Sequence, residues 1–579
     1  MDIKNIKIHS FRGINFLDWN VDGNFLCLIG PGDSTKTTIL DAIEFALTSR
    51  RNVIFDDTDF YDTKTENPIS IEVTAGSLPK ELLSDSKFGY LIKGWNTHAG
   101  IRDEPAEQDE PVLTMQLRVD KTLEPTWRVV NNRDPEGKFI SAFDRTKFGV
   151  SRIGEYMDWQ LSWGQGSALS RLMDQKEDVR PILADARRQA KASLDPNNLP
   201  LILQSAKNAA TIGQKIGVTV KSEDGFLPDL DIRSVNIGAG ILALHDDNVP
   251  VRQTGLGSSR LLTMGLQHEA ARNGGITLID EFEYGLEPHR IRRLLHVFKN
   301  GIPLQEPTPG SINNKAISTE CANQFFFTTH SPIVLCELEP KDLRVVRSIA
   351  GETHIYKPDD ELRSLFRTNP DAFLARKVIV CEGKTEIGFC RALDNWWSSS
   401  GLCFAYVGAV LANGEGSNKG PNSAISFKKL GYDTAYFGDS DAPITPNETT
   451  LNNNGIFTII WNGSVSIEER IALDLPWAGF IEMAQQAIDE KGEDHVVAKL
   501  SQQLSCKIQD ISVDPETWNT LDNIRLNFAK AAKAKKAEWF KRVDQAEKLG
   551  KIVIKYWEEI KDKDLGEGIT KLKGWAHDR

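Results

Sequence analysis

The sequence lacks paired cysteines, long apolar runs and an excess of positive charge. Its seven cysteines form no CxxC pair, which excludes the common zinc and thiol-redox motifs. Isolated cysteines in apolar runs are typical of reduced core thiols in a cytosolic protein. No apolar run approaches the length of a membrane span, and the opening residues, MDIKNIKIHSF, alternate like a strand and lack the apolar core of a signal peptide. We therefore expect a cytoplasmic protein with no membrane contact.

The charge balance limits how the chain can meet nucleic acid. The formal net charge is -12 over 579 residues, which argues against binding through bulk positive charge. Any contact with DNA must then come from local basic patches. The chain is also long for one hydrophobic core, so we expect about two to four domains. No internal repeat or heptad series is present.

A phosphate-binding loop is predicted near the amino terminus. A strand over residues 24–29 runs into the loop GPGDSTKTT, residues 30–38, and a helix is expected over residues 39–47. Backbone N–H groups of such a loop cradle phosphates, the lysine reaches the terminal phosphates, and the next hydroxyl binds Mg²⁺. The residues assigned to ATP are Gly30, Gly32, Lys36, Thr37 and Thr38. Taken alone, the loop could also be an ordinary Gly/Pro turn before a helix.

The loop departs from the usual pattern at one position. Thr35 stands where a glycine usually precedes the lysine. A β-branched residue resists positive φ at a cost on the order of 1–3 kcal/mol. We therefore expect a loop that is reshaped or that binds nucleotide less well, and slow ATP turnover.

Three later stretches add the other parts of an ATP site. A strand over residues 276–279 ends in Asp280, which suits the Mg²⁺ shell, and Glu281, which suits the base that polarises water. A Gly/Ser turn with Gly257 and Ser258 precedes a helix and is suited to anions. His330 follows a strand over residues 325–327 and can contact the γ-phosphate.

In this order, the phosphate loop, signature turn, acid pair and switch histidine make residues 1–350 resemble an ATPase head of the ABC type found in SMC-like proteins. Strands of an antiparallel layer are expected at residues 69–75, 112–119 and 126–130. Helices expected at residues 167–193 and 201–212 would form an inserted helical dimerisation element at about residues 155–215. The resemblance implies a homodimer that sandwiches ATP between the loop of one copy and the signature of the other.

A second site is predicted in the later part of the chain. The run RKVIVCEGKTE, residues 376–386, places Glu382 at the end of a short buried strand. A second strand, residues 434–437, is followed by Asp439 and Asp441, which point to the same side of an extended chain. If the strands are neighbours, the three acids meet at the carboxyl edge of one sheet, where oxygen ligands select Mg²⁺ or Mn²⁺. The alternative is a helix start and a solvated turn.

The order of elements around these acids resembles the Toprim domain of topoisomerases, primases and nucleases. Strands are expected at residues 402–407 and 456–461, with helices at 387–396 and 423–430. A head of the ABC type followed by a Toprim unit resembles the OLD (overcoming lysogenization defect) family of nucleases, to which the nuclease subunit of the Gabija defence system is also similar. We therefore expect an α/β protein with the head at residues 1–350, a Toprim domain at 370–475 and a helical, lysine-rich region at 476–579.

The resemblance implies metal-dependent DNA cleavage and further site residues. Glu382, Asp439 and Asp441 match the metal-binding acids, Glu386 matches a further acid, and Glu468, chosen over its neighbour, matches a later one. Residues 529–555 hold nine Lys/Arg against three Asp/Glu, and the segment KAEWFK within them implies Lys541 near the scissile phosphate. An amphipathic lysine-rich helix is the alternative there.

These observations predict an ATP-regulated DNA endonuclease in bacterial anti-phage defence that uses Mg²⁺ or Mn²⁺. Its catalytic residues are Glu382, Asp439, Asp441, Lys541 and Glu281. Its partners would be DNA, further copies of itself and an accessory defence protein. One alternative is a nucleotide-sensing scaffold whose Toprim unit does not cleave but recruits another effector. Another is a DNA-repair ATPase with incidental nuclease activity.

Overall fold

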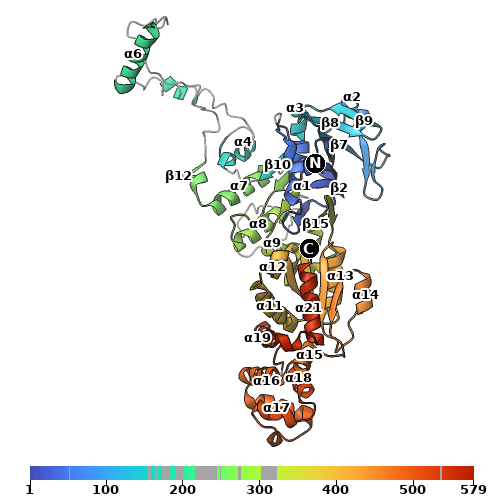
Figure 1. The fold of residues 1–579 in the computed structure, drawn as a ribbon. Helices are drawn as coiled ribbons and strands as arrows, with labels where there is room; N and C mark the ends of the chain where they lie inside the picture. Colours follow the sequence, from blue (N-terminus) through green and yellow to red (C-terminus); the bar gives the residue numbers. More distant parts are fainter. Residues whose placement is uncertain are drawn as a thin grey trace, which may run out of the picture.

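The computed structural model describes residues 1–50, 53–153, 158–163, 167–172, 182–183, 185–186, 188–189, 200–215, 244–247, 249–270, 275–300, 323–534 and 538–578. Figure 1 shows a large sheet with its helices in the upper part, around the amino terminus, and a second α/β unit below it. The carboxyl-terminal helices lie at the lower end, and the last of them returns to the middle. Much of the predicted dimerisation element lies outside the described residues.

The centre of the large sheet is parallel. Its strands, in spatial order, are β10 (Val150–Ile153), β13 (Gly275–Ile279), β14 (Asn323–Thr328), β3 (Phe25–Ile29) and β15 (Leu343–Ile349). All six residues of β14 are buried, as expected of a strand covered on both faces. The phosphate loop follows β3, Asp280 follows β13, and the turn with His330 follows β14. Parallel pairing therefore brings these three segments to one edge.

The rest of this sheet is largely antiparallel. It contains β1 (Asp2–Phe11), β2 (Ile14–Asn20), β4 (Ile69–Gly76), β5 (Lys93–Asn96), β6 (Gly100–Arg102), β7 (Glu110–Val119), β8 (Pro125–Asn131), β9 (Asp134–Phe139) and β16 (Glu352–Tyr356). Strands β4, β7 and β8 confirm the predicted antiparallel layer. The remaining short strands are β11 (His245–Asp246) and β12 (Val249–Pro250), which pair with each other.

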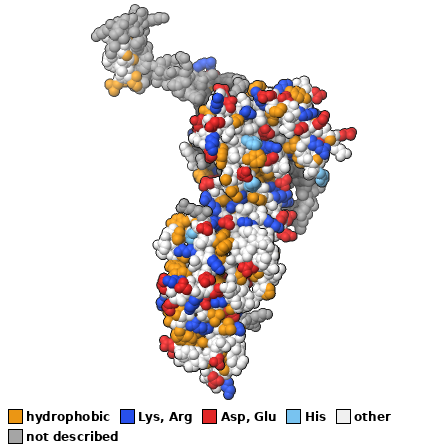
Figure 2. Space-filling view, turned by 45° about the vertical axis from the view of Figure 1, so that its right-hand side comes forward, with side chains coloured by type: hydrophobic (Ala, Val, Ile, Leu, Met, Phe, Trp, Pro, Cys, Tyr) orange, Lys and Arg blue, Asp and Glu red, His pale blue; other side chains and the backbone are white. Residues whose placement is uncertain are grey.

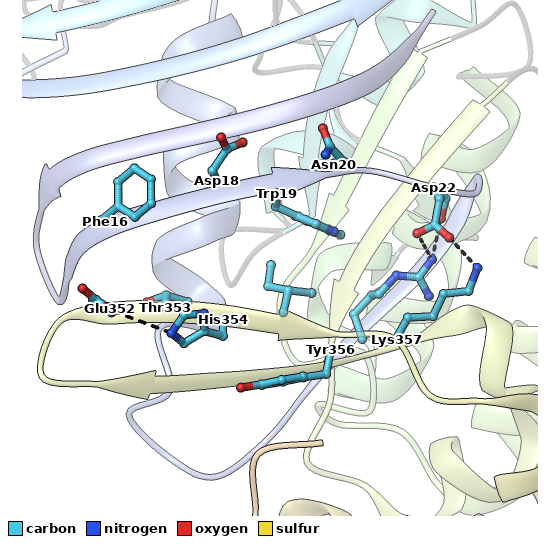
Figure 3. Close-up of a pocket in the computed structure, with 12 residues that line it drawn as sticks. Phe16, Asp18, Trp19, Asn20, Asp22, Glu352, Thr353, His354, Tyr356 and Lys357 are labelled. Atoms are coloured by element: carbon cyan, nitrogen blue, oxygen red, sulfur yellow. Dashed lines mark hydrogen bonds and ion pairs between the residues drawn. The ribbon is translucent and has the colours of Figure 1, made fainter. Parts of the chain in front are cut away.

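Strands β2 and β16 pair only at Glu352 and Phe16, so they diverge and leave a hollow of about 350 Å³ (Figure 3). Asp22 closes one end of the hollow by accepting hydrogen bonds from Arg344 and Lys357. Arg344 is almost fully buried. The Arg344 pair therefore joins β15, the neighbour of β3, to the turn between β2 and β3, and the Lys357 pair joins the end of β16 to the same turn.

The helices of the first part lie around this sheet, except for α6 (Pro200–Lys215), which lies well away from it (Figure 1). They are α1 (Lys36–Leu47), α2 (Asp85–Phe88), α3 (Ala142–Arg145), α4 (Ala168–Arg171), α6 (Pro200–Lys215), α7 (Leu256–Ala270), α8 (Pro288–Asn300), α9 (Pro332–Glu337) and α10 (Arg363–Thr368). In α8 the buried residues Ile291, Leu294, Leu295 and Phe298 follow the spacing of one helical face. Helix α6 confirms the helix predicted over residues 201–212.

The second unit is a four-stranded parallel sheet with the order β18, β17, β19, β20. Its elements are β17 (Lys377–Cys381), α11 (Lys384–Ser398), α12 (Phe404–Val407), β18 (Ala409–Asn413), α13 (Lys419–Lys429), β19 (Asp433–Gly438), α14 (Glu448–Asn453), β20 (Phe457–Ile460) and α15 (Ile467–Asp474). The predicted strand over residues 402–407 is wrong. Those residues include helix α12, which ends at Gly408 with φ of 67°, and the strand follows it.

The carboxyl-terminal helices complete the core of this unit. They are α16 (Trp477–Lys491), α17 (Glu493–Leu504), α18 (Ile524–Lys533), α19 (Val543–Lys555), α20 (Trp557–Ile560) and α21 (Asp564–His577). Helix α19 packs closely on α11, since a Cβ at Gly388 would lie 2.3 Å from the Val543 carbonyl oxygen. Lys377 at the start of β17 donates to the Trp575 carbonyl, 3.1 Å away, which holds the end of α21 at the middle of the molecule.

The two α/β units share one hydrophobic core, which includes Cys27 of β3, Val378 of β17 and Phe427 of α13. Arg347 of β15 donates to the carbonyl oxygens of Ala375 and Arg376, 3.2 and 3.0 Å away. The segment that enters β17 is therefore fixed to the first sheet. The domain boundaries expected from the sequence stay predictions.

On the face shown in Figure 2, acidic and basic side chains are interspersed. Among the helices that the structure describes, none is both long and apolar enough to cross a membrane. The described cysteines are free thiols, and Cys27, Cys381 and Cys390 are buried.

Candidate functional site

The phosphate loop joins β3 to α1 and contains left-handed backbone positions. Gly30 has φ of 144°, and a Cβ there would lie 2.5 Å from the Val346 carbonyl oxygen. Thr35 has φ of 65°, so it takes the strained conformation, which costs about 1–2 kcal/mol. Its hydroxyl donates to the Ser34 carbonyl at 2.6 Å and lies 3.2 Å from the Thr353 hydroxyl. These contacts offset part of the strain.

Lys36 is folded back onto the loop. Its ammonium donates to the carbonyl oxygens of Gly30 and Pro31 and to the Ser34 hydroxyl, at 3.1, 2.7 and 3.1 Å. Burial lowers the pKa of Lys36 to about 8, although neighbouring carboxylates act in the opposite direction. A bound phosphate would take the place of these neutral acceptors and would favour the charged form.

The hydroxyl and the acid assigned to Mg²⁺ lie together, although 243 residues separate them in sequence. Thr37 donates to Asp280 at 3.2 Å, and Thr328 donates to the same oxygen at 2.6 Å. Arg152 contacts the other oxygen at 3.2 Å. Thr328 and Arg152 were not predicted from the sequence, because neither belongs to a recognisable motif. The remaining loop residues assigned to ATP also flank the start of α1, Gly32 being exposed and Thr38 half-buried.

A third acid in this region fixes the backbone at the switch histidine. Glu283 accepts hydrogen bonds from the Thr329 hydroxyl at 2.6 Å and from the His330 backbone N–H at 2.7 Å. Partial desolvation, followed by the charge of Lys36, lowers the pKa of His330. Glu281 is exposed and has φ of 47°. Glu283 was not predicted from the sequence because Asp280 and Glu281 already supplied the two acids that the expected motif requires.

The signature turn begins α7 and contacts a different part of the head. A Cβ at Gly257 would lie 2.5 Å from the Gly285 carbonyl oxygen, so only glycine fits there. Ser258 is exposed, and its hydroxyl accepts a hydrogen bond from Arg290 at 3.3 Å. The buried Arg260 donates to the carbonyl oxygens of the two acids that follow β13, at 2.9 and 2.6 Å. The signature helix is thus tied to the acid strand.

The predicted carboxylates meet at the carboxyl edge of the second sheet. Strands β17 and β19 are parallel neighbours. Glu382 accepts hydrogen bonds from the backbone N–H of Asp439 at 2.9 Å and from the Tyr436 hydroxyl at 3.4 Å. Asp439 accepts one from the Ile467 N–H, at 2.7 Å, at the start of α15. The turn after β17 and the turn after β19 are therefore in direct contact.

Two further acids lie beside Glu382, Asp439 and Asp441. Glu386 is 4% exposed and Glu468 is 5% exposed. Burial, and next the charge of Glu468, raises the pKa of Glu386 to about 8. Burial together with the charges of Glu386 and Glu468 raises the pKa of Asp439 well above its usual value. Burial also raises the pKa of Glu382 and of Glu468. Together the five acids form a carboxylate cluster: Glu382, Glu386, Asp439, Asp441 and Glu468.

Lys533 at the end of α18 is the cation that sequence reasoning missed. Its ammonium lies 2.7 Å from Asp441 and 3.1 Å from Glu469. Lys541 is half-exposed and 3.9 Å from Glu538. Both lysines act to lower the pKa of Glu468, against its burial. Lys533, which pairs with Asp441 at the edge of the cluster, thus lies eight positions before Lys541, the lysine that the resemblance implies.

The donor set of the cluster is composed of carboxylate oxygens, which suit Mg²⁺ or Mn²⁺. Within the residues that the structure describes, no group of three or more His, Cys, Asp or Glu side chains is arranged so that it could hold a metal ion. Several oxygens instead accept hydrogen bonds from protein donors. An ion would therefore have to replace those contacts.

Comparison with known families concerns the first part of the chain. Residues 25–336 match the family described as "AAA domain, putative AbiEii toxin, Type IV TA system". The chain belongs to this family. The prediction of an ATPase domain is thereby confirmed, and the α/β class is confirmed by the mixed sheet. The match ends before the second sheet begins.

Among solved structures, similar proteins are heads of Smc proteins. The SmcHead bound to the C-winged helix domain of ScpA is 13% identical, with a TM-score of 0.32, over 62% of this chain and 98% of that chain. The Smc head with an extended coiled coil from Pyrococcus furiosus, bound to the C-terminal domain of ScpA, is 10% identical, with a TM-score of 0.31, over 61% and 95%. The head from Thermotoga maritima is 13% identical, with a TM-score of 0.28, over 62% and 100%. The family assignment does not depend on them.

The lowered pKa of Lys36 predicts a pH dependence of ATP binding. Because phosphate favours the ammonium, binding takes up a proton once the free lysine loses its charge, above pH 8. The affinity should change little below pH 7, be lower by about twofold at pH 8, and fall by up to about tenfold per pH unit above it. Calorimetric titration with ATP and Mg²⁺ at pH 7, 8 and 9 measures this. Lys36→Arg should bind without that decline, and a decline that persists in it would contradict the assignment.

Proposed function

We propose that this protein is an ATP-regulated DNA endonuclease that depends on Mg²⁺ or Mn²⁺ and acts in bacterial anti-phage defence. The ATPase domain, shown by the family match, would control the activity. Phosphodiester hydrolysis would take place at the carboxylate cluster of the second unit. The resemblance of the sequence to OLD-family nucleases with a Toprim domain leads to the same conclusion.

The observation that carries the proposal is the contact between Glu382 and the backbone of Asp439, at 2.9 Å. It joins two turns that are far apart in sequence at the edge of a parallel sheet, where sites in open α/β folds form. Buried carboxylates so close together repel one another, and the raised pKa values of Glu382, Asp439 and Glu386 reflect their burial and this repulsion. A divalent cation would relieve that repulsion.

The residues of this site would have different roles. Glu382, Asp439 and Asp441 would hold the ion, with Glu386 and Glu468 behind them. A bound divalent ion supplies the Lewis acidity that activates water and stabilises charge on the scissile phosphate. Lys541, whose side chain is half-exposed, would contact that phosphate from the solvent side.

A homodimer is supported by the signature turn. Ser258 is exposed and pairs with Arg290, and Gly257 packs on Gly285. The turn is thus presented to solvent as a partner's nucleotide would require. Helix α6 also exposes apolar side chains, Leu201 by 86% and Ile202 by 53%. These observations support self-association, and an accessory defence protein is a further proposed partner.

A second candidate function is a nucleotide-sensing scaffold that does not cleave DNA. One observation favours it: oxygens of Glu382, Asp439 and Asp441 accept hydrogen bonds from protein donors. A cluster satisfied in this way could serve a structural role. The two functions differ in whether DNA is hydrolysed.

Plasmid cleavage tests the proposal. Supercoiled DNA incubated with the protein and Mn²⁺ or Mg²⁺ should be nicked or linearised, and Asp439→Asn should lose at least about a hundredfold in rate, because the ion loses a charged ligand. Asp433→Asn, at the opposite end of the same strand, is the matched control and should cleave normally. Equal cleavage by wild type and Asp439→Asn would exclude the cluster as the site. No cleavage by the wild type under either metal would favour the scaffold.

The two lysines should respond differently to substitution. Lys533→Ala removes the cation that pairs with Asp441 and Glu469 and should lower the free energy of unfolding by about 1–3 kcal/mol. Lys541→Ala loses no close pair and should keep the melting temperature but lose cleavage. Thermal melting and plasmid cleavage on both variants measure this. Normal cleavage by Lys541→Ala, or equal destabilisation by both substitutions, would contradict the roles assigned to the two lysines.

A further inference from the structure

A crevice of about 690 Å³ separates the phosphate loop from the second α/β unit. On the side of the ATPase domain its lining includes Pro31, Gly32 and His330. On the side of the second unit it includes Arg376 and Arg391. Two arginines that lie outside the matched family domain therefore face the region where the terminal phosphate of ATP is expected.

Arg376 already contacts the phosphate loop through a weak and replaceable ion pair. Its guanidinium lies 3.6 Å from the carboxylate of Asp33. The Asp33 side chain is 96% exposed and that of Arg376 is 60% exposed, so water competes strongly for both groups. A phosphate group carries more charge than a carboxylate and accepts the paired donors of a guanidinium well. It would displace Asp33 readily.

The backbone of Arg376 is fixed although its guanidinium is exposed. Its N–H donates to the Gly408 carbonyl at 2.8 Å, and its carbonyl accepts a hydrogen bond from Arg347 at 3.0 Å. The aliphatic part of the side chain packs beside Gly408, where a Cβ would lie 3.1 Å from Arg376 Cγ. The residue is therefore positioned in advance, and only the end of its side chain has to move.

The other charged groups of the crevice leave this arginine available. Asp394 accepts a hydrogen bond from the Phe404 backbone N–H at 2.6 Å. Asp371 is exposed, as is Arg391 on α11. Helix α11 begins at the turn that follows Glu382, so one helix borders both the crevice and the carboxylate cluster.

We propose that Arg376 releases Asp33 and binds instead the terminal phosphate of the ATP that the phosphate loop holds. ATP, but not ADP, then ties the second unit to the loop from within the same chain. The inference rests on ATP binding at the phosphate loop, which is part of the proposed function, and not on DNA cleavage. It identifies how the second unit would detect which nucleotide is bound.

Nucleotide affinity tests the inference without any activity assay. The full chain is titrated by calorimetry with ATPγS or ADP in the presence of Mg²⁺. Arg376→Ala should bind ATPγS about tenfold more weakly, which corresponds to about 1.4 kcal/mol, and ADP within about twofold of wild type. Arg363→Ala is the matched control, since that arginine is 51% exposed and paired with Glu339. It should leave both affinities unchanged.

Three results would overturn the inference. They are an equal loss for both nucleotides in Arg376→Ala, no loss for ATPγS, and a loss of the same size in Arg363→Ala. If the wild type binds neither nucleotide, the ATP site fails as well, which separates that failure from the failure of Arg376 alone.

The exchange of partners has its own test in Asp33→Asn. Asparagine tolerates the left-handed conformation at this position, where φ is 60°, and removes only the charge. ATPγS should bind a few-fold more tightly to Asp33→Asn, and this gain should shrink in the double variant with Arg376→Ala. A gain of the same size in both backgrounds would show that Asp33 acts on the phosphate directly and would overturn the exchange.

Discussion

The carboxylate of Glu382 and the backbone N–H of Asp439 hold together the edge of the second sheet, and the proposed chemistry depends on that contact. It requires β17 and β19 to be neighbours in register, with Cys381 opposite Phe437. The same register places like charges close together inside the protein, which is energetically costly. The fold therefore gathers carboxyl groups whose ionisation is unfavourable, and Lys533 pairs with them only at the edge, through Asp441. A divalent cation is the natural complement of such a cluster.

The connection between the two units is rigid where the backbone crosses it. A continuous core and the hydrogen bonds from Arg347 fix the segment before β17 to the first sheet. The charged groups that face the crevice are loosely held by comparison. Signals between the units would therefore pass through side chains such as Arg376, while the backbones keep their relative position. This arrangement suits a response to charge on the nucleotide.

Much of the framework could be predicted from the sequence because it depends on local patterns. Buried strands that end in acids placed Asp280 and Glu382 at strand ends, and a glycine-rich loop before a helix placed Lys36 at the start of α1. Thr37 and Asp280 were assigned separately to Mg²⁺, and the structure shows them in contact. The strand predicted over residues 402–407 failed because its apolar run fits a short helix equally well, and Gly408 decides between them. Lys533 and Arg152 act through tertiary contacts, which the spacing of residues along the sequence does not reveal.

Metal binding to the nucleotide-free protein tests the central claim most directly. Mn²⁺ is titrated by calorimetry at about pH 7.5 into the wild type and Asp439→Asn, in two buffers that differ in ionisation enthalpy. The account predicts binding to the wild type with proton release, because the raised pKa values leave carboxyl groups of the cluster partly protonated, and a clear loss of affinity in the variant. Equal affinity in both proteins, or no binding to the wild type, would contradict it.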